Sequence, residues 1–334
     1  MKKFIKKYEE IITVNKLLSA WEGFLAGKKQ RSDVAVFQSR LMDNILALYH
    51  DLKNKTYLHE EYKAFNISDP KPRNIHKATV RDRLLHHLLY QETYDFFDRQ
   101  FIYDSYSCRL NKGTHRAIRR FADFTRSVSR NNRKTVWVLK CDIRKFFASV
   151  DHQILKNILA KYIVDKDLLW LFGQVIDSFN TEGKQGIGLP LGNLTSQLLV
   201  NIYMNGFDQF VKRDLKIKYY ARYADDFIFL DKDRNSLVTI FLQIDKFLKN
   251  TLKLFLHPDK CFIKTLTSGV DFLGWVQFCG YRVLRTSTKK RVFKRIEGDS
   301  DSSPIIATYL GLLKHGNGHK LGERIIKYEV NKIL

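Results

Sequence analysis

The chain has 334 residues, 44% of them apolar, so it can bury a large core and form two or three closely joined subdomains. Lysine and arginine total 58 against 35 aspartate and glutamate, and a net charge of +23 favours a nucleic-acid partner over an anionic membrane. No apolar run approaches the roughly 20 residues of a spanning helix, and four cysteines without a C-x-x-C pair argue against a zinc site or a disulfide framework.

The N-terminal part is expected to be mostly helical. Helices are predicted over about the first 50 residues, and a strand and turn with basic residues follow over 65–75. Apolar residues at helical spacing predict a helix that begins near Val80. After an irregular segment over 101–115, another helix at about 115–129 bears several arginines.

The middle of the chain alternates strands and helices. Residues 135–143 form a β-rich run that contains Asp142 near its end. Asp151 resembles the N-cap of the next helix. A glycine-rich loop over 183–192 then leads into a helix that starts near Asn193.

Two adjacent carboxylates, Asp225 and Asp226, lie between two runs of apolar and aromatic residues, which predicts a strand, a tight turn and a second strand. A helix at about 235–250 and a short hairpin that starts at Val270 are expected next. The last 50 residues are basic and mostly helical.

Adjacent carboxylates at a turn repel each other and need a nearby cation. If the strands that carry Asp142 and Asp225-Asp226 are neighbours in one sheet, their carboxylates converge on one point. Two divalent metals about 3.5–4 Å apart at such a point can activate a primer 3′-hydroxyl and stabilise the leaving pyrophosphate. Either site alone is more simply a polar turn, but together, in so basic a chain, they favour a metal site.

Three motifs in this order resemble those of reverse transcriptases: residues 140–147 with Asp142, the loop and helix start at 188–197, and the tetrapeptide Tyr-Ala-Asp-Asp at 223–226. The resemblance runs from about Asp69 to Trp275. It implies an α+β right-hand polymerase whose palm has an antiparallel, ferredoxin-like sheet. The implied domains are an N-terminal helical extension (1–60), fingers (61–135), a palm (136–275, with a finger-side insert near 152–190) and a helical thumb (276–334).

The resemblance also implies site residues. Two Mg²⁺ ions, for which Mn²⁺ can substitute, are held by the three catalytic aspartates and a neighbouring position: Asp142, Ile143, Asp225 and Asp226. The incoming dNTP is contacted by Lys71, Arg73, Phe147, Leu191, Gly192, Gln197 and Lys260. The primer grip comprises Phe272, Leu273, Gly274 and Trp275, and the duplex backbone is contacted by Arg282, Arg285, Lys289, Lys290 and Arg291.

Several of these residues have a physical rationale. A bulky ring at Phe147 clashes with a ribose 2′-hydroxyl and selects dNTP over NTP. Cations at Lys71 and Arg73 neutralise triphosphate charge, and Lys260 can act as a general acid. The simpler alternatives are a core phenylalanine, a solvated basic turn and a surface lysine. The basic thumb segment predicts binding that weakens steeply with salt.

Within the family, the chain most resembles the reverse transcriptases of diversity-generating retroelements. Leu191 precedes the loop glycine where most of the family has glutamine, and Ser196-Gln197 replaces Ser-Pro. Further likenesses are found at residues 81–87, 104–115 and 313–317. The resemblance implies cDNA synthesis from a template-repeat RNA with misinsertion opposite adenines, a small basic oligomeric accessory protein, and a cytoplasmic enzyme of bacterial or phage origin without a membrane partner.

Two alternatives remain. One is another bacterial reverse transcriptase, from a group II intron, a retron or a phage-defence system. The other is a non-catalytic RNA-binding scaffold that kept a polymerase fold. Such a scaffold can lose its acidic residues freely, so the presence of Asp142, Asp225 and Asp226 together argues against it.

Overall fold

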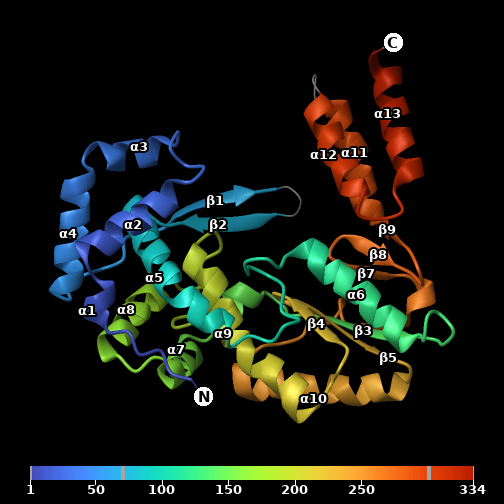
Figure 1. Cartoon of the computed structure of the whole chain (residues 1–334), viewed down its shortest axis with the longest axis horizontal. Coiled ribbons are helices and arrows are strands. Elements are labelled where there is room, and N and C mark those ends of the chain that lie inside the picture. The colour runs from blue at the N-terminus through green and yellow to red at the C-terminus, as the bar shows by residue number, and fades with distance from the viewer. Residues whose placement is uncertain (1, 69–71, 299–301, 334) are drawn as a thin grey trace. The chain divides into compact units, whose positions relative to one another are not determined.

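The computed structural model of the chain describes residues 2–68, 72–298 and 302–333 (Figure 1). The chain divides into two compact units, each assembled from segments that are separate in sequence. The first contains Met1–Tyr103, Ile143–Leu215 and Asp245–Phe255, and the second contains Asp104–Asp142, Lys216–Ile244 and Leu256–Leu334. The long helix α10 (Arg234–Leu252) contributes to both units.

The first unit is mainly helical. Its elements are α1 (Tyr8–Ile11), α2 (Val14–Leu25), α3 (Ser32–Ser39), α4 (Leu41–Lys53), β1 (Lys63–Ile67), β2 (Arg73–Lys77), α5 (Val80–Asp98), the 3₁₀-helix η1 (Phe146–Ser149), α7 (His152–Tyr162), α8 (Lys166–Asp177), α9 (Leu194–Gln209) and the π-helix η2 (Phe210–Asp214). β1 and β2 pair as an antiparallel hairpin. Leu17, Trp21 and Phe24 lie on one buried face of α2, at the spacing of an amphipathic helix.

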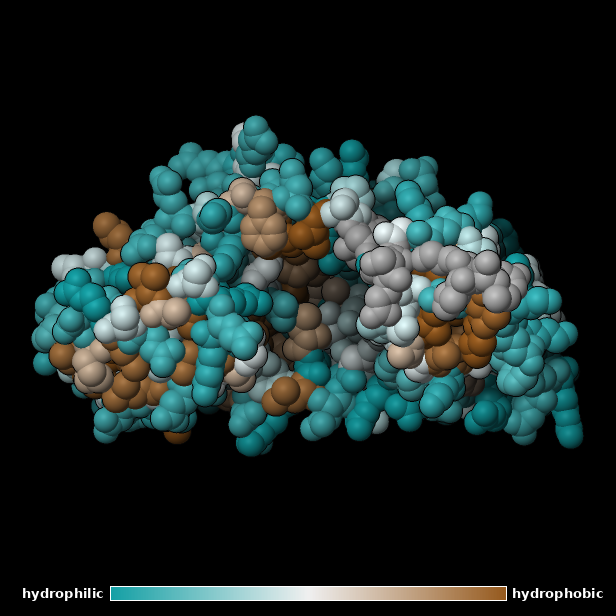
Figure 2. Space-filling model, turned by 90° about the horizontal axis from the view of Figure 1, so that it is seen from above, coloured by the Kyte–Doolittle hydropathy of each residue, from teal (hydrophilic) through white to brown (hydrophobic). Residues whose placement is uncertain are grey.

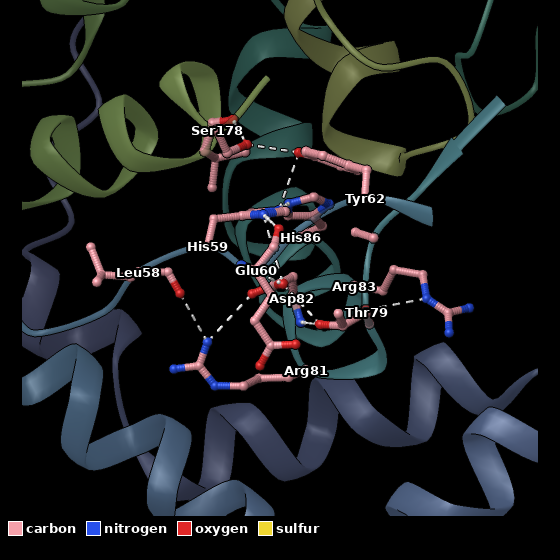
Figure 3. Close-up of polar contacts among 12 residues, drawn as sticks. Leu58, His59, Glu60, Tyr62, Thr79, Arg81, Asp82, Arg83, His86 and Ser178 are labelled. Carbon is pink, nitrogen blue, oxygen red and sulfur yellow. Dashed lines mark hydrogen bonds and ion pairs between the residues drawn. The ribbon is translucent and has the colours of Figure 1, made fainter. Parts of the chain in front are cut away.

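A buried polar network surrounds Asp82, in the first turn of α5 (Figure 3). This fully buried carboxylate accepts hydrogen bonds from Tyr57 Oη at 2.7 Å and Thr79 Oγ1 at 2.8 Å. The backbone N–H of Glu60 donates a third bond at 3.1 Å. Both oxygens of Asp82 are therefore satisfied, as a buried carboxylate requires.

Two histidines extend this network. His59 Nε2 lies 3.2 Å from His86 Nε2 and 3.2 Å from Tyr62 Oη, and Tyr62 in turn lies 2.7 Å from Ser178 Oγ (Figure 3). Burial lowers the pKa of His86 to about 3, so its imidazole is neutral at physiological pH. The network joins α5 to the segment before β1 and to the C-cap of α8.

The second unit is built on two antiparallel sheets. Its elements are α6 (Thr114–Val128), β3 (Trp137–Asp142), β4 (Tyr220–Tyr223), β5 (Asp226–Asp231), β6 (Phe262–Thr265), the 3₁₀-helix η3 (Leu266–Ser268), β7 (Val270–Phe272), β8 (Trp275–Gln277), β9 (Arg282–Leu284), α11 (Thr286–Gly298), α12 (Ser303–Leu313) and α13 (His319–Ile333). The larger sheet has the order β4-β5-β3-β6, and the smaller one has the order β7-β8-β9.

One face of the larger sheet packs against α6. Phe121 and Phe124 of α6 share a core with Val138 of β3 and Ile228 of β5. Because side chains alternate along a strand, Lys140 and Asp142 lie on the same face as Val138, and Asp226 lies on the same face as Ile228. The sheet face that is apolar in its middle therefore becomes polar at one end.

The smaller sheet and the last three helices share a second core, which includes Trp275, Leu284, Val292 and Ile296. In Figure 2 apolar side chains gather over α11–α13, framed by hydrophilic ones. A Cβ added to Gly316, between α12 and α13, would lie 2.1 Å from the Trp275 ring, so only glycine lets this loop approach the sheet so closely.

The predicted α+β class with antiparallel sheets is confirmed. The sequence analysis located the hairpin at Asp225-Asp226 and the helices that begin at Val80, Thr114 and Leu194. It missed β6 and α8, and the strand and turn at 65–75 are a two-stranded hairpin. Within the described residues, no helix combines the length and apolar character needed to cross a membrane.

Candidate active site

The turn between β4 and β5 is held in an uncommon backbone conformation. Tyr223 pairs with Asp226, which leaves Ala224 and Asp225 as a two-residue loop. Ala224 has φ +55°, a value that such hairpin loops usually reserve for glycine, asparagine or aspartate. Backbone strain of this kind persists where the surroundings fix it, and it is concentrated at functional sites.

Arg222 provides that fixation. Its side chain is fully buried, and its guanidinium donates to the Ala224 carbonyl at 3.1 Å and to Ser105 Oγ at 3.2 Å. The backbone of Arg222 also bonds the irregular segment beside β4, because its N–H donates to Asp104 O at 2.9 Å and its carbonyl accepts from Tyr106 N at 2.9 Å. The strand and this segment thus clamp the base of the turn.

Asp142 and Asp226 lie directly opposite each other in the antiparallel pair β3–β5. Like charges in this position destabilise a sheet unless a cation compensates them. Lys140, two residues before Asp142 and only 8% exposed, places its Nζ 3.4 Å from Asp226 Oδ2. The lysine supplies part of the compensating charge from within the sheet.

Asp226 remains incompletely satisfied. Its Oδ1 is buried and has no hydrogen-bond partner among the described residues, although 17% of the side chain is exposed. Burial raises the pKa of Asp226 to about 7, Lys140 opposes this shift, and the charges of Asp225 and Asp142 add to it. A buried carboxylate oxygen without a partner is costly, and a bound cation would remove that cost.

Asp142 is held on its other side by the segment that precedes β6. Lys260 Nζ donates to Asp142 Oδ1 at 3.0 Å, and the backbone N–H of His257 donates to the Asp142 carbonyl at 2.8 Å. Two cysteines adjoin this aspartate. A hydrogen bond with Cys141 is the largest of the effects that lower the pKa of Cys261 to about 7, whereas burial raises the pKa of Cys141.

The donor set fits a hard divalent cation. Asp142, Asp225 and Asp226 offer carboxylate oxygens, which Mg²⁺ and Mn²⁺ prefer, and Asp226 Oδ1 awaits a partner. In the part of the chain that the structure describes, no three His, Cys, Asp or Glu side chains converge closely enough to hold an ion as they stand. Lys260 Nζ lies 3.0 Å from Asp142 Oδ1, so it would compete with a bound metal for that oxygen. Ile143, which follows Asp142, is buried.

The residues expected to contact the nucleotide base and sugar lie in the first unit. Phe147 is half-buried in η1, and its carbonyl accepts from Leu189 N at 2.8 Å. The Leu191 carbonyl accepts from His76 N of β2 at 2.9 Å. Gly192 has φ +109°, and a Cβ there would lie 2.7 Å from the Ile75 side chain. The nucleotide loop and the β1–β2 hairpin are therefore in contact.

Arg73 begins β2 and is exposed, and Gln197 is half-buried in the first turn of α9. Lys71 lies outside the described residues.

The segment expected to grip the primer forms the β7–β8 turn. Phe272 and Trp275 are buried in the two cores of the second unit, so their side chains are structural. Leu273 and Gly274 form the loop with φ +52° and +86°, and the Gly274 carbonyl accepts from Arg285 N at 3.1 Å. The backbone of this turn and the partly exposed Leu273 side chain remain for contact with another molecule.

The basic residues expected on the duplex backbone are not equivalent. Arg285 is paired with Asp271, its NH2 group lying 2.6 Å from Oδ1. Arg282 donates to the His315 carbonyl. Lys289, Lys290 and Arg291 lie on α11, where Lys290 is exposed and the other two are half-buried.

Sequence reasoning missed Arg222 and Lys140 as residues of this site. A signal was present for Lys140, since a lysine two residues before a strand-end aspartate shares its sheet face. No local signal marks the burial of Arg222, because one of its acceptors, Ser105 Oγ, is 117 residues away.

Comparison with known proteins gives a consistent result. Residues 66–277 match the family described as reverse transcriptase (RNA-dependent DNA polymerase). The chain is 22% identical to the "Putative COX1/OXI3 intron 2 protein" of Saccharomyces cerevisiae, over 76% of this chain and 36% of that protein. It is also 22% identical to the group II intron-encoded protein LtrA of Lactococcus lactis, over 75% of this chain and 51% of that protein. The chain therefore spans about a third to a half of these relatives.

The fold also matches that of a solved structure. Apo telomerase from Candida tropicalis, truncated from its C-terminal domain, aligns with a TM-score of 0.51 and 14% identity. The alignment covers 73% of this chain and 60% of the telomerase chain. The shared architecture is that of a right-hand polymerase.

Proposed function

The chain belongs to the reverse transcriptase (RNA-dependent DNA polymerase) family, and we propose that Asp142, Asp225 and Asp226 form its nucleotidyl-transfer site. The observation that carries the proposal is the position of Asp142 directly opposite Asp226, whose Oδ1 is buried without a partner. Two carboxylates that face each other in a sheet are costly for folding alone, and they suit a site that binds cations.

Bound Mg²⁺, or Mn²⁺ in its place, supplies the Lewis acidity that activates a primer 3′-hydroxyl and stabilises the leaving pyrophosphate. The protein's part is to hold the carboxylates in place. Arg222 fixes the turn that carries Asp225, and Lys140 keeps Asp226 partly compensated. Lys260, released from Asp142, is proposed to give a proton to the pyrophosphate.

Phe147 is proposed to select dNTP by excluding a 2′-hydroxyl, with Leu191, Gly192 and Gln197 beside the incoming nucleotide. Arg73, together with Lys71, would neutralise triphosphate charge. The fingers, palm and thumb are proposed to follow the boundaries given in the sequence analysis. Exposed Lys290 and its neighbours on α11 are proposed to contact the template–primer backbone, with the β7–β8 turn at the primer end.

The test is primer extension on an RNA template. Wild-type protein is expected to incorporate dNTPs only with Mg²⁺ or Mn²⁺, and Asp225→Asn is expected to abolish incorporation. Asp233→Asn, an exposed aspartate beyond the far end of β5, is the matched control and should retain activity. If no template, primer or partner supports incorporation, the non-catalytic scaffold is favoured.

For the biological role, we propose copying of a template-repeat RNA with misinsertion opposite adenines. Leu191 and Gln197 support this role, since leucine cannot donate a side-chain hydrogen bond to the nucleotide as glutamine can. A role like that of group II intron proteins is the second candidate, and the likeness to LtrA favours it. Sequencing cDNA made from the cognate RNA separates them, because only the first predicts errors concentrated at adenines.

Leu191→Gln gives a sharper test of the first role. It is expected to lower the error rate opposite adenine, and Leu189→Gln should disrupt packing instead, because Leu189 is buried. An unchanged error spectrum for Leu191→Gln would remove the proposed cause of the errors. We further propose that the enzyme acts in the cytoplasm of a bacterium or phage host, with a small basic accessory protein.

A further inference from the structure

Two adjoining pockets lie in the second unit, where three distant segments meet. They are formed by α6 and the loop after it, the β8–β9 turn, and the loop between α12 and α13. The larger pocket has a volume of about 350 Å³ and the smaller one about 180 Å³. Arg282, Lys314 and His315 line both, so the two share a wall.

The walls are held by specific contacts. Asn317 N donates to the Arg282 carbonyl at 2.8 Å, and Arg282 N donates back to Asn317 Oδ1 at 3.3 Å. The imidazoles of His115 and His315 stack with ring centroids 3.8 Å apart. Together with the close approach of Gly316 to Trp275, these contacts define a built site rather than a loose surface gap.

The lining is strongly basic. Arg126 and Lys314 contribute cations to the larger pocket, and Arg119 contributes one to the smaller. The described residues that line the two pockets include no aspartate or glutamate. Arg126 has a distant ion pair with Asp123, at 3.8 Å, on the solvent side of α6. Burial lowers the pKa of the Arg282 guanidinium, and repulsion from the charge of Arg119 lowers it further.

Two further features indicate that the ligand of these pockets is larger than a simple ion. Gln277 is 3% exposed and lines the larger pocket, and in the part of the chain that the structure describes its Nε2 has no hydrogen-bond partner. Tyr281 stacks on Phe278 with ring centroids 4.8 Å apart, yet the tyrosine remains 48% exposed. An unpartnered amide donor suits a polar base edge or a phosphate oxygen, and an exposed ring supported from behind suits base stacking.

We propose that these pockets bind a single strand of nucleic acid, with a stacked base and two successive phosphates. A pocket of about 350 Å³ accommodates one nucleotide, and the adjoining basic pocket takes the next phosphate. A free mononucleotide would leave the smaller pocket's cations uncompensated. RNA outside the copied duplex is the strand that the proposed function supplies, and single-stranded DNA offers the same chemistry.

The probe is a fluorescein-labelled RNA octamer of uridines, with binding measured by fluorescence anisotropy on the full chain. Arg126→Glu combined with Lys314→Glu is expected to weaken binding about tenfold or more, because two phosphate contacts are reversed. Lys232→Glu combined with Lys320→Glu is the matched control, with the same change of net charge on exposed residues outside the pockets. Tyr281→Ala should also weaken binding without any change of charge.

The same variants are assayed for extension of a preannealed RNA–DNA duplex. Extension that stays within about twofold of wild type, with octamer binding lost, supports a site separate from catalysis. Equal losses of octamer binding in both charge-reversal pairs would overturn the proposal, as would full displacement by equimolar uridine monophosphate. If the pocket variants also lose binding of a thymidine octamer, the site binds single-stranded DNA as well as RNA. Absence of extension in wild type, with pocket-dependent binding intact, would contradict the proposed function but leave this site standing.

Discussion

Asp82 in the first unit is a fully buried carboxylate, whereas Asp226 in the second is partly exposed and has one buried oxygen. Asp82 accepts bonds from two hydroxyls and a backbone N–H, so both its oxygens are used. Asp226 pairs with Lys140 at 3.4 Å, and its buried Oδ1 has no partner within the described residues. The comparison separates a carboxylate that stabilises the fold from one that is kept ready to bind something else.

The largest effect is expected at the satisfied carboxylate. Asp82→Ala should lower the free energy of unfolding by about 3–5 kcal/mol, because buried Tyr57, the Thr79 hydroxyl and the Glu60 N–H all lose their acceptor. Urea denaturation measures this change. Asp43→Ala removes an exposed aspartate paired with Arg40 and should cost less than about 0.5 kcal/mol. Equal losses in the two variants would mean that the network around Asp82 contributes little.

The next effect concerns the turn that carries Asp225. Arg222→Met should lower kcat for dNTP incorporation about 100-fold, because the Ala224 carbonyl loses its donor and the carboxylates shift. Arg234→Met makes the same chemical change at the other end of β5 and should stay within about twofold. A rise in KM with kcat unchanged would indicate that Arg222 affects substrate binding, not carboxylate position.

Per pH unit, a smaller effect on stability is expected from the titration of His86 in the first unit. The folded-state pKa of His86, about 3, lies below the ordinary histidine value of 6.5. The unfolded chain therefore binds the extra proton first as pH falls below 6.5, and the native state loses up to about 1.4 kcal/mol per pH unit. Above pH 6.5 His86 is neutral in both the folded and the unfolded state, so the native state keeps its full stability.

Urea denaturation between pH 7 and 4 measures this dependence. His86→Gln should flatten the curve, because glutamine does not titrate. His50→Gln, at an exposed position on α4, is the matched control. A wild-type slope that survives His86→Gln would assign the pH dependence to other groups.

Much of this arrangement follows from local sequence. Apolar alternation on either side of Asp225-Asp226 predicts the hairpin, and the strand that ends at Asp142 follows from its β-branched and aromatic residues. Asp151 acts as an N-cap as predicted, accepting from Ile154 N at 3.0 Å. These features depend on neighbours a few residues apart, which a sequence displays directly.

The remainder depends on distant pairings. The strand β6 has four residues and is too short to produce a clear sequence pattern. Lys260, just before this strand, contacts Asp142, which lies 118 residues earlier in the chain. The buried role of Arg222 and the basic pockets likewise require segments more than 100 residues apart. Long-range contacts, which decide these features, leave no periodic trace in the sequence.

The most direct test measures both the activity and the stability of one variant. Asp226→Asn should abolish Mg²⁺-dependent dNTP incorporation while its free energy of unfolding stays equal to that of wild type or rises, because a poorly satisfied buried charge is removed. Retained incorporation, or a loss of stability as large as that of Asp82→Ala, would contradict the assignment of Asp226 to the metal site.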